Sequence, residues 1–383
     1  MEQNESDAFT HKGFTVNKSL KFATFTSLIC VIRAEYISMK NKINIFDLTL
    51  EEMKAVFEEM GLPKFRAAQV WQWLYEKGAQ TFADMTNLPK DLRYRLDSRF
   101  TISHIQLEKR QASRDGTEKY LFRLEDGSFI ESVLIPSGKR LTLCISTQVG
   151  CKFGCLFCAS GKGGFMRNLT VGEITGQVLY AAHRLGTKPT NVVLMGMGEP
   201  LDNYENVETA IRIMNSSTGL SIGARKITIS TCGIIPAMKR LEKIGMQIEL
   251  SISLHAADDE LRTKLMPINK KYPIDKLIQA CREYSENTKR LVTFEYLMLS
   301  GINDSIRQAE ELAALLRGFM SKVNIITMNP VGSGVYEPSN SHRVKEFCDM
   351  LIKRGVPATV RKSRGADILA ACGQLRLCEI KLS

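Results

Sequence analysis

The sequence predicts an α/β protein built around a partial (β/α)6 barrel, with a small N-terminal helical domain and a β-hairpin linker before it. Three observations predict this fold. Apolar runs typical of buried strands alternate with helical patterns from residue 141 to residue 354, and six such units in series favour a parallel barrel. Short amphipathic helices come first in the chain. Two strand-like runs joined by a turn lie between those helices and the barrel.

Composition limits the class of protein. The chain has 383 residues with 52 Lys and Arg against 41 Asp and Glu, which gives a net charge of +11. This balance favours a polyanionic partner, although a generally basic protein would have it too. No apolar run reaches the roughly 18 residues of a membrane span. Ten cysteines are too few for a disulfide scaffold. They favour metal or redox chemistry in a reducing compartment, so we expect a cytoplasmic protein without a membrane segment.

The N-terminal part divides into an extension and a helical domain. We expect residues 1–38 to lie outside the fold. Their stretch 22–32 follows two lysines and imitates a signal peptide, but no clear cleavage site follows it. Residues 39–110 are predicted to form the helical domain, whose first helix starts with the capping box Thr49-Leu50-Glu51-Glu52 and stops at Gly61. Two further helices should open at prolines, Pro63 and Pro89.

The linker, the barrel and the tail follow in that order. Residues 111–140 are predicted to form a hairpin, with strands 119–124 and 129–135 around the turn Glu125-Asp126-Gly127-Ser128. Residues 141–363 form the barrel, and residues 364–383 form a tail. The six strand candidates are 141–147, 191–196, 226–230, 247–254, 292–299 and 323–328, and the helical patterns are 171–185, 203–215, 235–244, 273–287, 305–317 and 341–354.

The loop after the first predicted barrel strand carries Cys151, Cys155 and Cys158 in the spacing CxxxCxxC. Thiolates are soft ligands for zinc, copper(I) or iron–sulfur clusters. A structural zinc site needs four ligands, and no fourth Cys or His follows nearby. Three thiolates can instead hold three irons of a [4Fe–4S] cluster and leave the fourth iron open. This spacing is typical of the radical S-adenosylmethionine (SAM) enzymes; the alternative is three unrelated cysteines.

Polar residues follow the other predicted strands, at the end of a parallel barrel where chemistry takes place. After the second strand, Gly196-Met197-Gly198-Glu199-Pro200 combines glycines, which let a ligand approach the backbone, with a carboxylate that can accept from an ammonium group. Such a turn alone is common. Later strands end in Ser230, Ser253-Leu254-His255 and Asn329, which suit ribose, carboxylate and adenine recognition but are equally typical turn caps.

Two further cysteines and a glutamate differ from the rest. A lone cysteine is usually a small buried hydrophobe, and we interpret Cys30, Cys232, Cys281, Cys348 and Cys378 in this way. Cys144 lies inside the first barrel strand, and Cys372 precedes Gly373 on the tail. Glu131 alternates with apolar neighbours and can face a cavity or water. Five basic and no acidic residues lie between residues 353 and 364; they predict a phosphate contact that includes Arg361 and Lys362.

Taken together, these stretches resemble the RlmN family of radical SAM RNA methyltransferases, and more distantly Cfr. The resemblance covers about residues 46–375, and only the N-terminal extension and the short tail depart from it. The matching motifs are Phe65-Arg66-Ala67-Ala68-Gln69-Val70, Ile130-Glu131-Ser132-Val133, Thr142-Leu143-Cys144, the three cluster cysteines, Arg167-Asn168-Leu169-Thr170, Gly196-Met197-Gly198-Glu199-Pro200, Ser253-Leu254-His255, Met266-Pro267-Ile268-Asn269 and Ala370-Ala371-Cys372-Gly373-Gln374.

The resemblance implies methylation of adenosine carbon 2 in 23S ribosomal RNA, at the peptidyl-transferase centre, and in tRNA at position 37. It implies one [4Fe–4S] cluster, two SAM molecules per turnover and an external electron donor such as a flavodoxin-type reductant. We also expect a monomer. Nine basic and five acidic residues between residues 90 and 123 indicate RNA contact by the helical domain, and a solvated charged face is the alternative. By resemblance Cys372 carries the methyl group, Cys144 releases the product through a transient Cys144–Cys372 disulfide, and Glu131 or Cys144 removes the carbon-2 proton. The matching SAM-contact positions are Gly198, Glu199, Ser230, Ser253, Leu254, His255 and Asn329.

Two other functions fit parts of the sequence. A Cfr-type enzyme would methylate carbon 8 of the same ribosomal adenosine, but Cfr has Gly-Glu-Ala where this chain has Gly198-Glu199-Pro200. A non-catalytic RNA-binding iron–sulfur protein would need neither an open iron nor both Cys144 and Cys372. The sequence therefore favours the carbon-2 methyltransferase.

Overall fold

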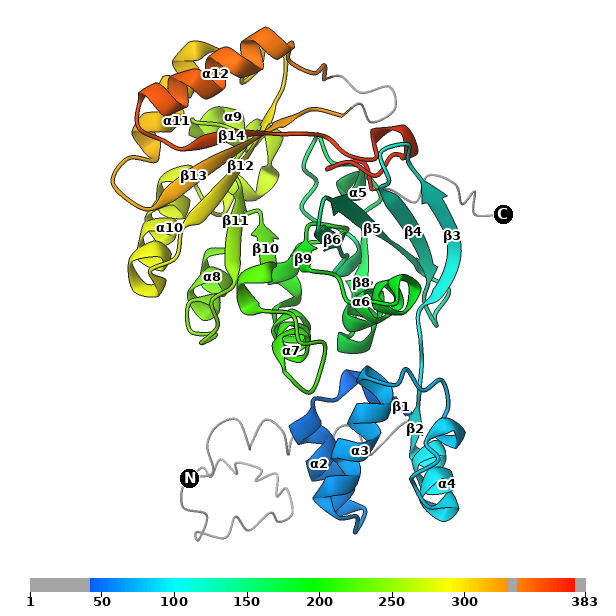
Figure 1. Cartoon of the computed structure of the whole chain (residues 1–383). Helices are drawn as coiled ribbons and strands as arrows, with labels where there is room; N and C mark the ends of the chain where they lie inside the picture. Colours follow the sequence, from blue (N-terminus) through cyan, green and yellow to red (C-terminus); the bar gives the residue numbers. More distant parts are fainter. Residues whose placement is uncertain (1–41, 330–335, 376–383) are drawn as a thin grey trace, which may run out of the picture. The chain divides into compact units, whose positions relative to one another are not determined.

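The computed structural model describes residues 42–329 and 336–375 (Figure 1). The predictions for the N-terminal extension, Cys30 and Cys378 fall outside the described residues. Across the residues that are described, none of the helices combines the length and apolarity that a bilayer-spanning segment requires.

A ten-stranded sheet forms the centre of the structure, in the order β14-β13-β12-β11-β10-β9-β6-β5-β4-β3. Its first seven members are parallel. They are β6 (Arg140–Cys144), β9 (Asn191–Leu194), β10 (Ile227–Thr231), β11 (Glu249–Ser253), β12 (Val292–Met298), β13 (Ser321–Thr327) and β14 (Ala358–Arg361). The six predicted barrel strands are confirmed. Strand β14 is a seventh that the sequence did not predict, because its four residues are partly or fully exposed and lack a strand-like apolar run.

The predicted hairpin is also confirmed, but it is part of the same sheet. Strands β4 (Glu118–Arg123) and β5 (Phe129–Ser137) pair antiparallel, and β5 continues the sheet by pairing with β6, so that Val133 lies opposite Cys144. Strand β3 (Gln106–Ala112) forms the edge. Six of its seven residues are exposed, which explains why its residues show no alternating pattern. The hairpin is therefore fixed to the barrel.

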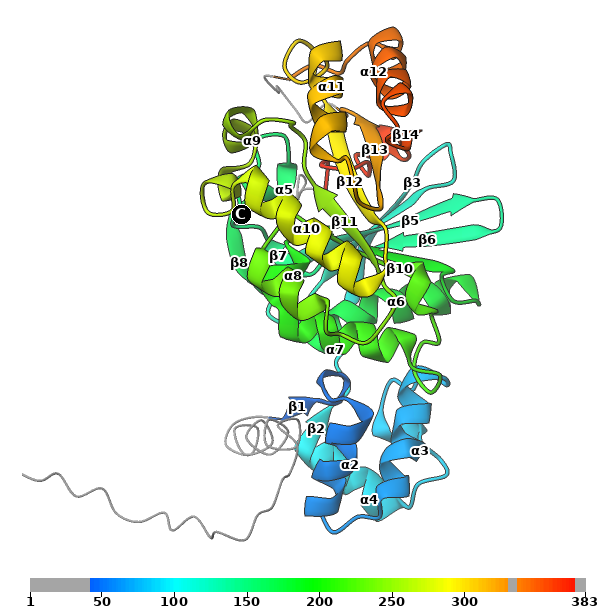
Figure 2. The same cartoon turned by 90° about the vertical axis from the view of Figure 1, so that its left-hand side faces the viewer.

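Helices cover the parallel strands as their amphipathic patterns predict. The six confirmed helices are α6 (Val171–Leu185), α7 (Tyr204–Asn215), α8 (Ile235–Leu241), α10 (Ile274–Thr288), α11 (Ile306–Leu315) and α12 (Ser341–Lys353). In Figure 2, α8 and α10 pass in front of strands β10 and β11. Two unpredicted helices, α5 (Ala159–Lys162) and α9 (Asp259–Leu265), lie in connections next to the cysteine loop. They are too short to show a periodic signal.

The N-terminal helices are α2 (Leu50–Glu59), α3 (Lys64–Tyr75) and α4 (Lys90–Arg99). The capping box at Thr49 is present, and Pro63 and Pro89 precede the other two helices as predicted. The segment before α2 contacts the barrel, because Asp47 Oδ1 accepts a hydrogen bond of 2.8 Å from the backbone N–H of Gly172 in α6. A side chain at Gly172 would lie 2.9 Å from Phe46 Cβ, so glycine permits this close approach.

Candidate active site

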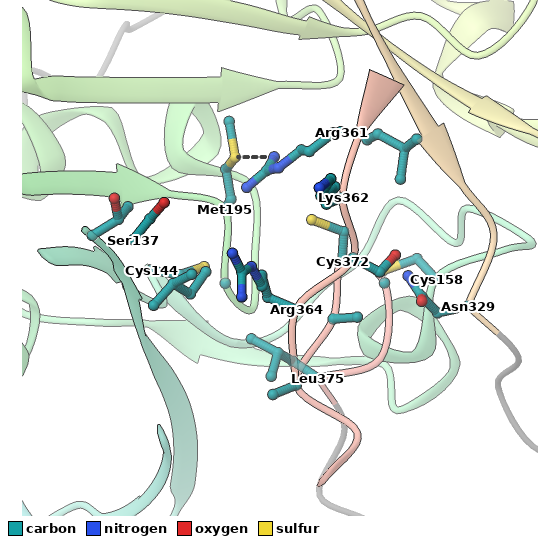
Figure 3. Close-up of a pocket in the computed structure, with 18 of the residues that line it drawn as sticks. Ser137, Cys144, Cys158, Met195, Asn329, Arg361, Lys362, Arg364, Cys372 and Leu375 are labelled. Atoms are coloured by element: carbon teal, nitrogen blue, oxygen red, sulfur yellow. Dashed lines mark hydrogen bonds between the residues drawn. The ribbon is translucent and has the colours of Figure 1, made fainter. Parts of the chain in front are cut away.

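Two adjoining cavities lie where the parallel strands end. The first, here called the cluster cavity, is lined by the three loop cysteines together with Gly198, Glu199, Ser230, Ser253, His255 and Glu295. The second, the cysteine cavity, has a volume of about 380 Å³ and is lined by Cys144, Asn329, Arg361 and Lys362 among others (Figure 3). Cys158, Arg361 and Cys372 line both. A volume of this size is within the range of small-ligand pockets.

The cysteine loop is held by backbone contacts that depend on glycine. Gly150 has φ +75°, and a Cβ there would lie 1.9 Å from the Gly164 carbonyl oxygen. Only glycine can occupy this position, which ends β7 (Gln148–Gly150) just before Cys151. Further along, the backbone N–H of Leu156 donates to the Leu265 carbonyl at 3.1 Å, which ties the loop to α9.

The three loop cysteines line one cavity, so all three could serve as ligands of one group bound there. A four-iron cluster would take each thiolate on a different iron and keep the fourth iron open. Burial raises the pKa of Cys151 to about 12 and also raises the pKa of Cys155. Binding of a metal would displace the protons from these two thiols.

The turn after β9 places Glu199 against the end of β10. Gly198 has φ +96°, and a Cβ there would lie 2.5 Å from Gln148 Cβ, so the turn requires glycine. Glu199 Oε1 accepts from the Leu201 N–H at 3.0 Å, and Oε2 accepts from the Cys232 N–H at 2.7 Å. Burial raises the pKa of Glu199. Both oxygens thus hold the protein backbone, and each retains only its second lone pair for a ligand.

His255 supports the cysteine loop. Its backbone is left-handed, with φ +58°, and its Nδ1 accepts a hydrogen bond of 3.0 Å from the Leu297 N–H. Its ring packs edge-on against Phe157 of the cysteine loop, with ring centroids 4.6 Å apart. Burial lowers the pKa of His255 to about 3, so the imidazole is neutral. This side chain is a structural support that also lines the cluster cavity.

The tail that carries Cys372 is anchored on both sides. On one side, Asp367 Oδ1 accepts from the Ser113 hydroxyl at 2.6 Å, in the turn between β3 and β4. On the other side, the Gly373 carbonyl accepts from the Ala159 N–H at 2.8 Å, and Ala159 directly follows the last cluster cysteine. Between these anchors Cys372 is exposed and lines both cavities.

Cys144 lies at the end of β6, beneath the tail. Its side chain is 8% exposed and packs with Ala370 and Leu375. Burial raises the pKa of Cys144 to about 12, and the guanidinium of Arg361 acts in the opposite direction. Both Cys144 and Cys372 are free thiols that line the cysteine cavity. The structure therefore brings together the two cysteines that the sequence singled out.

Glu131 faces neither the two cavities nor water. It is 4% exposed on β5, and its Oε1 lies 3.2 Å from Lys119 Nζ, a side chain of β4 that is itself buried. Lys119 Nζ also lies 3.5 Å from the Leu369 carbonyl of the tail. Lys119, which no motif of the sequence singled out, lies on the same face of the sheet as Glu131 and Cys144. Leu254 likewise lines neither cavity and is fully buried.

Arg361, for which the basic run predicts a phosphate contact, lines both cavities. Its Nη1 lies 3.7 Å from Met195 Sδ, and Figure 3 shows the side chain directed at Met195. The neighbouring Cys372 is the main cause of a raised pKa at Arg361, with smaller effects from Glu295 and Cys144. Lys362, the next residue, is exposed. Arg361 is the last residue of β14 and Lys362 follows the strand, so these two adjacent basic residues have different surroundings.

Comparisons with known proteins agree with this geometry. The model of the Radical SAM superfamily matches residues 145–314, and the model of the ribosomal RNA large subunit methyltransferase N-terminal domain matches residues 43–102. The dual-specificity RNA methyltransferase RlmN of a Nitratiruptor species is 46% identical over 349 residues, which cover 87% of this chain and 97% of the relative. The protein of the same name from Campylobacter jejuni is 45% identical over 354 residues, covering 88% and 98%.

Among solved structures, a radical SAM methyltransferase from Sphaerobacter thermophilus superimposes with a TM-score of 0.84 at 46% sequence identity. The match covers 87% of this chain and 99% of that one. The similarity thus extends over the helical domain and the barrel together.

Proposed function

Because the chain belongs to the RlmN family of dual-specificity RNA methyltransferases, within the radical SAM superfamily, we propose that it methylates carbon 2 of adenosine in two RNAs. These are 23S ribosomal RNA, at the peptidyl-transferase centre, and tRNA, at position 37. The observation that carries the proposal is the cysteine cavity, where Cys372 and Cys144 meet beside the cysteine loop. An ordinary methyltransferase needs neither thiol.

The residues fit both cofactors of the superfamily. Cys151, Cys155 and Cys158 would hold one [4Fe–4S] cluster. SAM would be bound at the residues of the matched positions, namely Gly198, Glu199, Ser230, Ser253, Leu254, His255 and Asn329. When bound, the cluster supplies the electron that splits SAM into methionine and a 5′-deoxyadenosyl radical. The electron would come from an external donor such as a flavodoxin-type reductant, and two SAM molecules would be used in each turnover.

Carbon 2 of adenine explains why the chain needs a carrier thiol. This carbon lies between two ring nitrogens and is electron-poor, so it does not attack the methyl group of SAM directly. Cys372 is exposed; its thiolate attacks the methyl carbon of one SAM, the carbon–sulfonium bond breaks, and S-adenosylhomocysteine leaves. Once that S-methyl group has lost a hydrogen atom, its carbon adds to carbon 2 and links the protein to RNA. The base radical formed by this addition then gives up one electron to an external electron carrier. Anchoring of the tail on Ala159 keeps this carbon close to the cysteine loop.

Cys144 then releases the product. Its thiolate attacks the sulfur of Cys372, forms a disulfide and frees the methylated base.

Two residues are candidates for removing the carbon-2 proton. Cys144 lines the cavity, whereas Glu131 is paired with Lys119 behind it. This arrangement favours Cys144 as the base and Glu131 as a residue that positions the tail through Lys119.

The rest of the chain would serve RNA binding. The helical domain carries exposed basic and aromatic side chains on α4, including Lys90 and Tyr94, which suit phosphate and base contacts. We assign residues 39–110 to this role, residues 141–363 to the catalytic barrel and residues 364–383 to the carrier tail. We further propose that the protein acts as a monomer in the cytoplasm.

Nucleoside mapping tests the function. Ribosomal RNA and tRNA from a strain that lacks the gene would be incubated with the cluster-loaded protein, SAM and a reductant, then digested and analysed by mass spectrometry. We expect 2-methyladenosine in RNA treated with the native protein and none with Cys372→Ala. Formation of 8-methyladenosine would instead show the Cfr-type reaction, and the absence of any methylated adenosine would contradict the proposal.

A further inference from the structure

Glu295 is a buried carboxylate in the cluster cavity that no role described above uses. It lies in the middle of β12 and is 4% exposed, and it lines the cavity together with Ser253. In the sheet register it lies opposite Ser253 of β11 on one side and Asn324 of β13 on the other. Its side chain therefore belongs to the cavity wall formed by strands β11 to β13.

One of the two carboxylate oxygens has no hydrogen bond of normal geometry among the described residues, although the Ser251 hydroxyl lies near the carboxylate. Glu295 Oε1 accepts a hydrogen bond of 3.1 Å from Asn324 Nδ2. Glu295 Oε2 is buried and has no hydrogen bond among the described residues. Burial raises the pKa of Glu295, while Arg361, Asn324 and Ser251 act against this. A buried carboxylate oxygen without a donor is costly, and such a group at the wall of a cavity indicates that a ligand supplies the donor.

Glu199, the other carboxylate in this cavity, is less available to accept a hydrogen bond from a ligand. Both oxygens of Glu199 already accept from backbone N–H groups. Arg361 lies close enough to influence Glu295 electrostatically. Its guanidinium, however, donates a hydrogen bond to Met195 Sδ. Of the carboxylate oxygens of Glu199 and Glu295, Oε2 of Glu295 is therefore the one most open to a bound molecule.

The position of β12 indicates which part of SAM would meet Glu295. SAM carries hydrogen-bond donors on its ammonium group, its two ribose hydroxyls and its adenine amino group. Its amino acid end must reach the cysteine loop, which follows β6. Strand β12 is separated from β6 by β11, β10 and β9 in the sheet. Because β12 lies this far from the cysteine loop, we expect Glu295 to meet the nucleoside end of SAM. A carboxylate that accepts from a ribose hydroxyl is a recurring feature of nucleotide sites.

We propose that Glu295 is a further SAM-binding residue, whose Oε2 accepts a hydrogen bond from a ribose hydroxyl. This inference rests on the proposed function, because it takes SAM as the occupant of the cluster cavity. Asn324 holds the other oxygen and so fixes the orientation of the carboxylate. Glu295 thereby adds a charged contact to the polar groups already assigned to SAM.

Binding measurements on the cluster-loaded protein test the assignment. Equilibrium dialysis would give the Kd of SAM, 2′-deoxy-SAM and 3′-deoxy-SAM for the native protein and for Glu295→Gln. We expect the native protein to bind one deoxy analogue about tenfold more weakly than SAM, as for loss of a charge-assisted hydrogen bond. Glu295→Gln should bind SAM about tenfold more weakly and should no longer distinguish that analogue from SAM.

A matched control is Glu249→Gln. Glu249 begins the neighbouring strand β11, pairs with Arg290 and is not among the residues of the cluster cavity; its variant should bind SAM as the native protein does. Two results would overturn the assignment and leave the proposed function intact. In the first, Glu295→Gln binds SAM with the same Kd as the native protein. In the second, Glu295→Gln still binds both deoxy analogues more weakly than SAM, as the native protein does. If Glu295→Gln does not fold, equal binding of all three compounds by the native protein overturns it. A native protein that holds the cluster but binds no SAM would overturn both proposals.

Discussion

Cys144 on strand β6 and Cys372 on the tail line one cavity, but their exposure differs. Cys144 is 8% exposed beneath Ala370 and Leu375, whereas Cys372 is exposed. In the proposed mechanism the accessible thiol of Cys372 receives the methyl group first, and the covered thiol of Cys144 acts afterwards. This difference in access suits two thiols that act one after the other.

We predict that Cys144→Ala traps a covalent protein–RNA adduct, because alanine has no thiolate to attack the Cys372 sulfur. Denaturing gel electrophoresis should show a slow band that RNase shortens and that thiol reductants leave intact. Cys372→Ala is the matched control, since it should fold and bind the cluster but form no adduct. A folded Cys144→Ala protein that turns over normally would refute the covalent mechanism.

Iron content tests the cysteine loop. After anaerobic reconstitution the native protein should contain about four irons per chain, and Cys155→Ala should lose most of the iron and the brown colour. Cys348→Ala, which changes a cysteine on α12 outside both cavities, should keep the native iron content. Tight binding of one zinc and no iron by the native protein would contradict the cluster.

The two basic residues at the end of β14 should behave differently. Lys362 is exposed, so Lys362→Ala should weaken RNA binding and reduce the slope of log K against log salt concentration by about one. Filter binding at several salt concentrations measures this slope. Lys345→Ala, which changes an exposed lysine on α12, is the control. An unchanged slope for Lys362→Ala would mean that the basic run is only a solvated surface.

The ion pair between Lys119 and Glu131 should contribute to the free energy of unfolding. Both side chains are at most 8% exposed, and removal of one partner leaves a buried charge. We expect Lys119→Met to lower the free energy of unfolding by about 3 kcal/mol, measured by denaturant titration. The double variant Lys119→Met, Glu131→Leu should recover most of that loss, because it removes both charges. Equal destabilisation of the single and double variants would contradict a role for the ion pair.

His255 predicts a pH dependence of stability. Its pKa is about 3 in the folded protein, against an ordinary value of 6.5. Below pH 6.5 the unfolded chain binds a proton that the folded protein does not, so this contribution to stability is present above pH 6.5 and is lost as the pH falls toward 3. The slope should approach about 1.4 kcal/mol per pH unit. His255→Asn, whose Oδ1 can accept from the Leu297 N–H, should lack this part of the slope in urea titrations between pH 7 and pH 5. A variant with the native slope would show that His255 titrates normally.

Much of the fold was predictable because local patterns encode it. The alternation of apolar runs and amphipathic helices between residues 141 and 354 determined the parallel barrel, since each element must bury one side. The spacing of Cys151, Cys155 and Cys158 predicted a metal site, and this was possible because residues on one loop are close in sequence as well as in space; the three cysteines do line one cavity. Strands β3 and β14 escaped prediction because most of their side chains are exposed.

The sequence by itself determined which residue types could react, and it singled out Cys144, Cys372 and the cysteine loop. Only the tertiary structure decided where they meet. The tail reaches the site because Asp367 and Gly373 bond to residues distant in the chain. The inward direction of Arg361, the burial of Lys119 beside Glu131, and the open oxygen of Glu295 depend on the same long-range packing. Such contacts join residues far apart in sequence, so no local pattern of residue types reveals them.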